Sequence, residues 1–115
     1  MSVTIWHNPR CSKSRQTLKL LTDRGMAPAI VEYLKTPPDP AELRNALAKL
    51  GMAPRDLMRR REPPYKSEGL DDESLPDEAL IQAMHDHPVL IERPVMFAGG
   101  KAALGRPPER VLDIL

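Results

Sequence analysis

The stretch VTIWHNPRCSKSRQTLKLLTDRGMAPAIVEYL, residues 3–34, contains the pattern that decides the fold. VTIW (3–6) is rich in β-forming residues and predicts a first strand, and IVEYL (30–34) predicts a second. Between them, residues 12–24 carry helical periodicity that stops at Gly25. Strand, helix and strand in this order form a βαβ unit, which favours a parallel strand pair with a right-handed crossover.

The middle of the chain has helical signals only. Asp39 as N-cap, Pro40 at the first helical position and Glu42 three residues after the cap predict a helix that ends at Gly51. We expect a shorter helix around 54–60, a loop over EPPYKSEGLDDESLP (62–76) and a further helix over 76–87. Residues 37–88 therefore form an all-helical insertion in the predicted fold.

The last part of the chain returns to strand patterns. In VMFAGGKAAL (95–104), two short β-like runs flank Gly99-Gly100, which is a signal for a two-residue hairpin. RPPERVLDIL (106–115) predicts a short amphipathic helix. The whole chain, residues 1–115, is thus expected to be a single α/β domain with a small sheet, helices on its faces and the helical insertion.

Composition narrows the classes of function. The chain has 115 residues, 41% hydrophobic and 29% charged, with a formal net charge of +1. This balance gives no reason to expect a nucleic acid or a membrane as partner. The beginning of the sequence lacks the pattern of a signal peptide, and one cysteine cannot form an internal disulfide, so we expect a cytoplasmic protein.

The single cysteine, Cys11, has the setting of a reactive thiol. It falls at the start of the first predicted helix, where free N–H groups and the helix dipole favour a thiolate. A cysteine can also be a small buried hydrophobe, but charged neighbours argue against that role here. Nearby side chains offer positive charge or hydrogen bonds to the sulfur: His7, Arg10, Ser12, Lys13, Ser14 and Arg15.

The spacing around Cys11 excludes two familiar chemistries. A thiol phosphatase loop needs an arginine after five intervening residues, whereas Arg15 follows after three. A dithiol oxidoreductase needs CxxC, and here Ser14 stands in place of the second thiol. An adduct on Cys11 must therefore be resolved by an outside thiol, for which glutathione is the abundant candidate. One cysteine and three histidines are too few and wrongly spaced for a metal site.

Four sequence motifs resemble those of a known protein family. HNPRCSKSR (7–15), LMRRREPPY (57–65), ERPV (92–95) and GRPPERVLDIL (105–115) resemble the ArsC family of glutaredoxin-coupled arsenate reductases, in order and spacing and over essentially the whole chain. The resemblance implies a thioredoxin-like fold with a mixed four-stranded sheet. It also implies an arsenate substrate, glutathione as co-substrate, glutaredoxin as partner and no bound cofactor.

The same resemblance implies roles for particular residues. Cys11 would attack arsenate, with His7 and Ser14 helping to stabilise its thiolate. Arg59, Arg93 and Arg106 would hold the oxyanion, because guanidinium groups give paired hydrogen bonds as well as charge. The family also implies a cis peptide bond between Arg93 and Pro94.

Alternatives remain open at this point. A slip of one residue in LMRRR would transfer the role of Arg59 to Arg60. The chain ends at VLDIL without the longer tail of some arsenate reductases, which is typical of a short branch of the family. The related Spx regulators contact RNA polymerase and use a CxxC switch, which Ser14 removes here. A third reading is a glutathione-dependent thiol-disulfide reductase, which would need Cys11 but not all three arginines.

Overall fold

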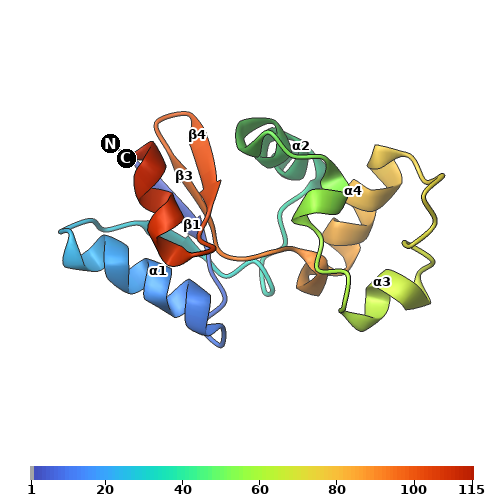
Figure 1. The fold of residues 1–115 in the computed structure, drawn as a ribbon, viewed down its shortest axis with the longest axis horizontal. Helices are drawn as coiled ribbons and strands as arrows, with labels where there is room; N and C mark the ends of the chain where they lie inside the picture. The colour runs from blue at the N-terminus through green and yellow to red at the C-terminus, as the bar shows by residue number, and fades with distance from the viewer. Residues whose placement is uncertain (1) are drawn as a thin grey trace. The chain divides into compact units, whose positions relative to one another are not determined.

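The computed structural model describes residues 2–115, and these form two compact units. The first unit consists of residues 2–36 together with 93–115, and the second consists of residues 37–92. Figure 1 shows the sheet and the first helix in the first unit and a group of helices in the second. The second unit contains residues 37–88, over which the insertion is expected, and continues to residue 92.

The first unit is built on a mixed four-stranded sheet. Its strands are β1 (Val3–Trp6), β2 (Ala29–Val31), β3 (Val95–Ala98) and β4 (Lys101–Leu104), in the order β2-β1-β3-β4. β1 and β2 are parallel, as the βαβ pattern predicts, and the other two pairs are antiparallel. β1 is therefore a central strand, and the loop that follows it leaves from the middle of the sheet.

β2 is shorter than the predicted strand over 30–34. The chain turns after Val31, because the N–H groups of Lys35 and Thr36 both donate to the carbonyl of Glu32, at 2.9 and 3.0 Å. Tyr33 is nonetheless buried, with 1% of its surface exposed. The apolar residues that suggested a longer strand thus lie in a turn.

α1 (Ser12–Asp23) packs its apolar stripe on the sheet. Thr17 and Leu21 are fully buried, and Leu21 joins a core with residues of β1, β3 and the C-terminal segment. The helix ends as predicted at Gly25, whose φ of 78° and N–H bond to Thr22 close a left-handed cap. The C-terminal segment η3 (Pro108–Ile114) is a 3-10 helix rather than an α-helix, and Val111 is its fully buried residue in the core.

The hairpin forms where the sequence predicts it. β3 and β4 are joined by Gly99 and Gly100, with φ of 56° and 77°. A two-residue turn of this kind requires positive φ at both central positions, which glycine adopts without strain.

The second unit is helical, as predicted, but its short elements differ from the expectation. α2 (Pro40–Leu50) begins with the predicted capping box of Asp39 and Glu42. The helix expected around 54–60 is only the 3-10 turn η1 (Pro54–Leu57). The remaining elements are α3 (Pro63–Ser67), α4 (Asp77–Asp86) and η2 (Pro88–Leu90).

α3 lies inside the segment predicted as a loop. Proline suits the first positions of a helix, and Tyr65 is buried, with its hydroxyl accepting a hydrogen bond of 2.7 Å from Arg55 Nη1. Packing of one aromatic ring therefore stabilises a helix too short to be recognised from periodicity.

Two hydrogen bonds extend the second unit to residue 92. The N–H of Arg59 donates to the carbonyl of Leu90 at 2.7 Å, and the N–H of Glu92 donates to the carbonyl of Leu57 at 2.8 Å. Residues 57–59 and 90–92 are thereby held side by side as an antiparallel bridge.

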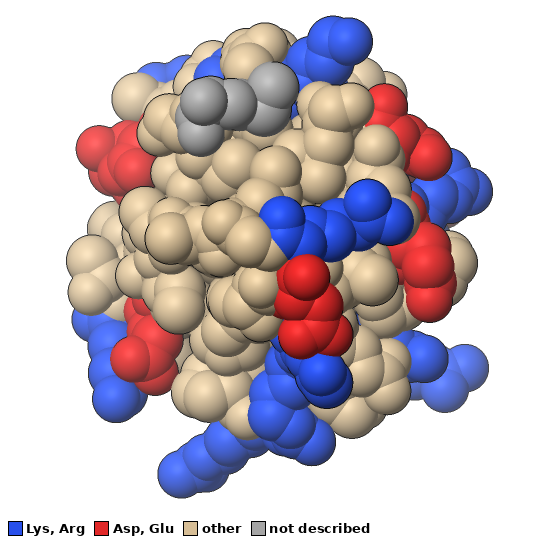
Figure 2. Space-filling view, turned by 90° about the vertical axis from the view of Figure 1, so that its left-hand side faces the viewer, with Lys and Arg blue, Asp and Glu red and all other residues tan. Residues whose placement is uncertain are grey.

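On the face drawn in Figure 2, basic and acidic side chains are interspersed. Within residues 2–115, every helix is too short or too polar to cross a bilayer.

Candidate active site

Cys11 is the N-cap residue of α1. The chain leaves the central strand β1, passes through a short turn in which the Cys11 N–H donates to the carbonyl of Asn8 at 3.0 Å, and enters the helix. Cys11 has extended backbone angles, and 7% of its surface is exposed. Its sulfur lies at the end of the helix where backbone N–H groups have no partner of their own, as the position of the motif predicts.

Two main-chain N–H groups and two guanidinium groups act on the sulfur. Burial raises the pKa of the Cys11 thiol, but the N–H groups of Ser14 and Lys13 and the charges of Arg93 and Arg106 outweigh it, so the pKa is lowered. The contributing charges come from residues far along the chain rather than from the basic side chains of the same loop. The site therefore favours the thiolate, which is the nucleophilic form of cysteine.

Arg93 and Arg106 reach this site from the two ends of the β3–β4 hairpin. Arg106 Nη2 lies 3.8 Å from Cys11 Sγ, and Arg106 Nε donates to the carbonyl of Arg93 at 2.8 Å. Both arginines precede a cis proline: the Arg93–Pro94 bond is cis, as the resemblance implies, and so is Arg106–Pro107. The hairpin thus joins two of the three predicted arginines to the cysteine within one unit.

His7 and Ser14 form a buried pair beside the cysteine. Ser14 Oγ lies 2.6 Å from His7 Nδ1 and accepts a hydrogen bond of 3.0 Å from the N–H of Asn8. Ser14 Oγ is thus shared between His7 Nδ1 and the N–H of Asn8, and the hydrogen bond that Ser14 gives to Cys11 comes from its backbone N–H.

The imidazole of His7 is neutral near pH 7. Burial lowers its pKa, Glu32 raises it, and Arg15 lowers it, with a lowered pKa as the net result. His7 therefore holds Ser14 and the start of α1 in place rather than supplying a positive charge.

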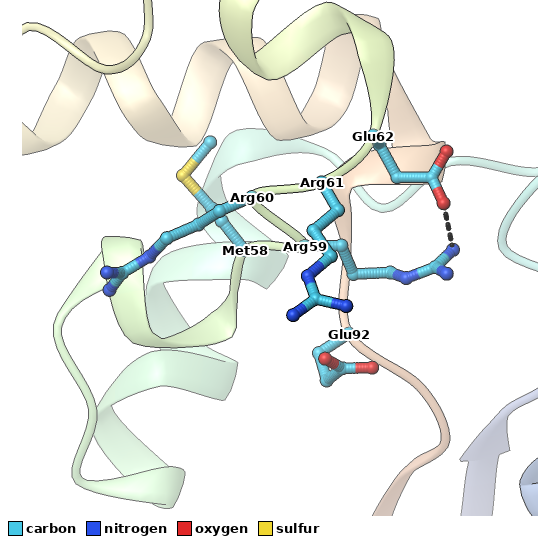
Figure 3. Close-up of a pocket in the computed structure, with 6 residues that line it drawn as sticks. All are labelled: Met58, Arg59, Arg60, Arg61, Glu62 and Glu92. Carbon is cyan, nitrogen blue, oxygen red and sulfur yellow. Dashed lines mark ion pairs between the residues drawn. The ribbon is translucent and has the colours of Figure 1, made fainter.

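Arg59 lies in the second unit, in a pocket of about 290 Å³. Its guanidinium is paired with Glu62, with 2.9 Å between Arg59 Nη1 and Glu62 Oε1 (Figure 3). Arg60 extends to the other side, where it approaches Asp56 at 3.9 Å and the carbonyl of Arg55 at 3.3 Å. The two candidates that the sequence left open thus have different partners, and of the two Arg59 is the more buried.

Sequence reasoning missed Glu62 and the backbone contacts. Glu62 follows Arg59 at the i+3 spacing typical of local ion pairs, and this spacing was the available signal. The N–H groups of Lys13 and Ser14 leave no trace in residue type, because every residue except proline carries one. A nucleophilic sulfur beside guanidinium groups is an arrangement that can bind and attack an anionic electrophile.

The fold has close counterparts among solved structures. The solved structure of an arsenate reductase from Vibrio cholerae is 51% identical, with a TM-score of 0.97 over 100% of this chain and 98% of that chain. The mixed sheet and its helices therefore define a thioredoxin-like protein.

Comparison of the sequence gives a narrower classification than comparison of the fold. Residues 6–114 match the ArsC family model. The chain is 58% identical to the uncharacterised protein YfgD of Escherichia coli (strain K12), over 98% of this chain and 96% of that protein. It is 51% identical to an arsenate reductase of Neisseria meningitidis serogroup A, over 98% of this chain and 97% of that protein. The chain belongs to the ArsC family.

Proposed function

We propose that this protein reduces arsenate to arsenite, with the Cys11 thiolate as nucleophile and with glutathione and glutaredoxin as electron donors. The observation that carries the proposal is the arrangement around the sulfur: a lowered thiol pKa and an Arg106 guanidinium 3.8 Å from Sγ. The names of the relatives from Vibrio cholerae and Neisseria meningitidis support arsenate as the substrate.

The proposed reaction begins with attack on arsenic. The thiolate of Cys11 forms an S–As bond, and one arsenate oxygen leaves as water after it takes up protons. Arg93 and Arg106 stabilise the anion and the charge that develops during attack. Arg59 is the third oxyanion ligand in this proposal, assigned on the family motif.

External thiols supply both electrons. A glutathione thiol displaces a second oxygen from arsenic as water. The glutaredoxin thiolate then attacks the glutathione sulfur, and the electron pair of the As–S bond stays on arsenic, which becomes As(III). Hydrolysis of the remaining Cys11–As bond releases arsenite and restores the cysteine. The chain has one cysteine, so the oxidised product is a disulfide between the two external thiols.

Replacement of Cys11 by serine tests the proposal. Arsenate-dependent oxidation of NADPH, coupled through glutathione reductase, glutathione and glutaredoxin, should fall to background in Cys11→Ser, because serine is a poor nucleophile at neutral pH. Circular dichroism of the variant reports whether the fold is retained. Turnover that persists in a folded Cys11→Ser protein would reject the mechanism.

Disulfide substrates in the same assay separate the competing enzyme class. A thiol-disulfide reductase needs the thiolate but not an oxyanion grip, so Arg93→Ala and Arg106→Ala should impair arsenate turnover far more than turnover of a small mixed disulfide. Disulfide turnover that exceeds arsenate turnover and is unchanged in both arginine variants would favour the reductase. An Spx-like role would instead require association with RNA polymerase that does not depend on Cys11.

A further inference from the structure

The pocket of the second unit is built on a fixed piece of backbone and has a volume of about 290 Å³. Its lining consists of Met58, Arg59, Arg60, Arg61, Glu62 and Glu92. The two main-chain hydrogen bonds between residues 57–59 and 90–92 hold the segments that carry these side chains. All the lining residues belong to one unit, so the pocket is complete within it.

Two of the three arginines in this lining are already engaged. Arg59 Nη1 lies 2.9 Å from Glu62 Oε1, and the two side chains are only 24% and 25% exposed. Arg60 extends to the other side, toward Asp56 and the carbonyl of Arg55. Since the charge of Arg59 is balanced by Glu62 and Arg60 is turned away, neither arginine gives the pocket an uncompensated positive charge.

The third arginine, Arg61, differs from both. Its side chain is exposed, and Figure 3 shows its guanidinium directed into the pocket. Within residues 2–115, no carboxylate lies at ion-pair distance from this guanidinium, and none of its nitrogen atoms donates a hydrogen bond. Glu92 lines the pocket as well but already interacts with another group. Arg61 therefore presents a positive charge and a fork of N–H donors to a ligand that enters the pocket.

A small oxyanion fits this combination of charge and size. The N–H groups of a guanidinium match neighbouring oxygens of a tetrahedral oxyanion and form charge-assisted hydrogen bonds with them. Pockets for drug-sized ligands begin at about 300 Å³, so a pocket of about 290 Å³ suits a smaller ligand with some of its water. Arg59 lines the same pocket and has N–H donors besides the one paired with Glu62, so both arginines can contact one ligand.

We propose that Arg61 binds the oxyanion substrate in this pocket and supplies the positive charge that Arg59, paired with Glu62, does not. The inference rests on the proposed function, and it adds a substrate-binding residue to the three arginines that the family motifs imply. Arg61 holds the anion before and during the attack alike. Its loss therefore affects the KM for arsenate rather than kcat.

Binding of inorganic phosphate to the full chain tests this inference, because phosphate has the shape and charge of arsenate but does not react with the thiol. In heteronuclear NMR titrations at constant ionic strength, the amide signals of residues 58–62 report occupation of the pocket and should shift in a saturable way. Arg61→Ala should weaken this binding about tenfold. Lys66→Ala removes an exposed cation of the same unit that does not line the pocket, and this matched control should bind like wild type.

Steady-state kinetics in the coupled assay give a second readout. Arg61→Ala should raise the KM for arsenate about tenfold and leave kcat unchanged, whereas general damage to the fold would lower kcat as well. Arg61→Lys keeps the charge but lacks the planar fork of donors, so it should recover only part of the lost affinity.

Three outcomes would overturn the inference: no saturable shift at residues 58–62 with phosphate in the millimolar range, equal affinity in wild type and Arg61→Ala, or an equal loss in Lys66→Ala. Phosphate binding that depends on Arg61, in a protein that does not reduce arsenate, would reject the proposed function and retain the oxyanion site. Arsenate reduction with the same KM in wild type and Arg61→Ala would retain the function and reject the role of Arg61.

Discussion

At the scale of single residues, the reactivity of Cys11 depends on groups from separate parts of the chain. The N–H groups of the helix start and the guanidinium groups of Arg93 and Arg106 act together against the effect of burial. The N–H groups belong to the helix backbone and remain when a side chain is replaced. Substitution can therefore remove only the share of the pKa lowering that the two arginines provide.

Arg106→Ala should raise the pKa of Cys11, because it removes the guanidinium 3.8 Å from Sγ. The midpoint of thiolate formation can be followed by ultraviolet absorbance or by the pH dependence of iodoacetamide alkylation. Arg110→Ala, four residues further along the chain, is the control for a general loss of positive charge. An unchanged midpoint in Arg106→Ala would contradict the electrostatic role of this residue.

Glu62→Gln should strengthen oxyanion binding, because Arg59 loses the carboxylate that occupies it. An ion pair of this kind contributes about 1 kcal/mol, so the KM for arsenate should fall about fivefold if Arg59 is an oxyanion ligand. Glu78→Gln is a matched control, since Glu78 also pairs with an arginine of the second unit, Arg44, at 2.7 Å. Equal KM values for wild type and Glu62→Gln would remove Arg59 from the oxyanion site.

At the scale of elements, α1 and the hairpin are held together by a close backbone approach. A Cβ atom on Gly105 would lie 2.5 Å from Thr17 Oγ1 and 2.7 Å from Pro94 Cγ. Gly105 also donates its N–H to the carbonyl of Pro94 at 3.0 Å. Glycine at this position therefore lets the end of β4 lie directly against the helix that carries the cysteine.

Gly105→Ala should destabilise the protein by about 1–3 kcal/mol, as overpacked positions in a well-packed core do. Urea denaturation measures the change in the free energy of unfolding. The loss should be smaller when Thr17→Ala is also present, because that substitution removes two of the three clashing atoms. Additive effects of the two substitutions would show that the clash is not the cause.

Strong local signals made most elements predictable from the sequence. The capping box at Asp39 and the glycine pair at 99–100 each specify one local geometry, and both are confirmed. α3 could not be predicted, because a helix of five residues depends on the burial of Tyr65 rather than on periodicity.

The candidate active site was predictable only in part, because several of its contacts depend on the conformation of the chain and of its side chains. Strand and helix boundaries were sufficient to place Cys11 at a helix start. The hydrogen bond between His7 and Ser14 could not be predicted, because the path of the chain between these two residues determines which group lies next to the Ser14 hydroxyl. The role of Glu62 as partner of Arg59 depends in the same way on side-chain conformation.

At the scale of the whole molecule, ionisation of Cys11 couples the site to folding. The pKa of this thiol is lowered in the folded state, whereas an unfolded cysteine titrates near about 8.5. Between these two values the unfolded chain binds a proton that the folded chain has released. Stability from this group is therefore complete above the unfolded pKa and is lost as the pH falls through the folded pKa.

Urea denaturation under reducing conditions at a series of pH values should show this dependence. The free energy of unfolding should rise with pH up to about 8.5, and Cys11→Ser should lose that part of the rise. Because the chain contains one cysteine, the difference between the two profiles isolates a single thiol. Parallel profiles for the two proteins would mean that the folded state does not favour the thiolate.

The contacts that Lys13 and Ser14 make with the sulfur through their main chain have an evolutionary consequence. Mutation can exchange the exposed side chain at position 13 for almost any other and leave the amide in place, with proline as the exception. Drift at this position is therefore expected to preserve the nucleophile, while the surface around it stays open to adaptation toward new protein partners.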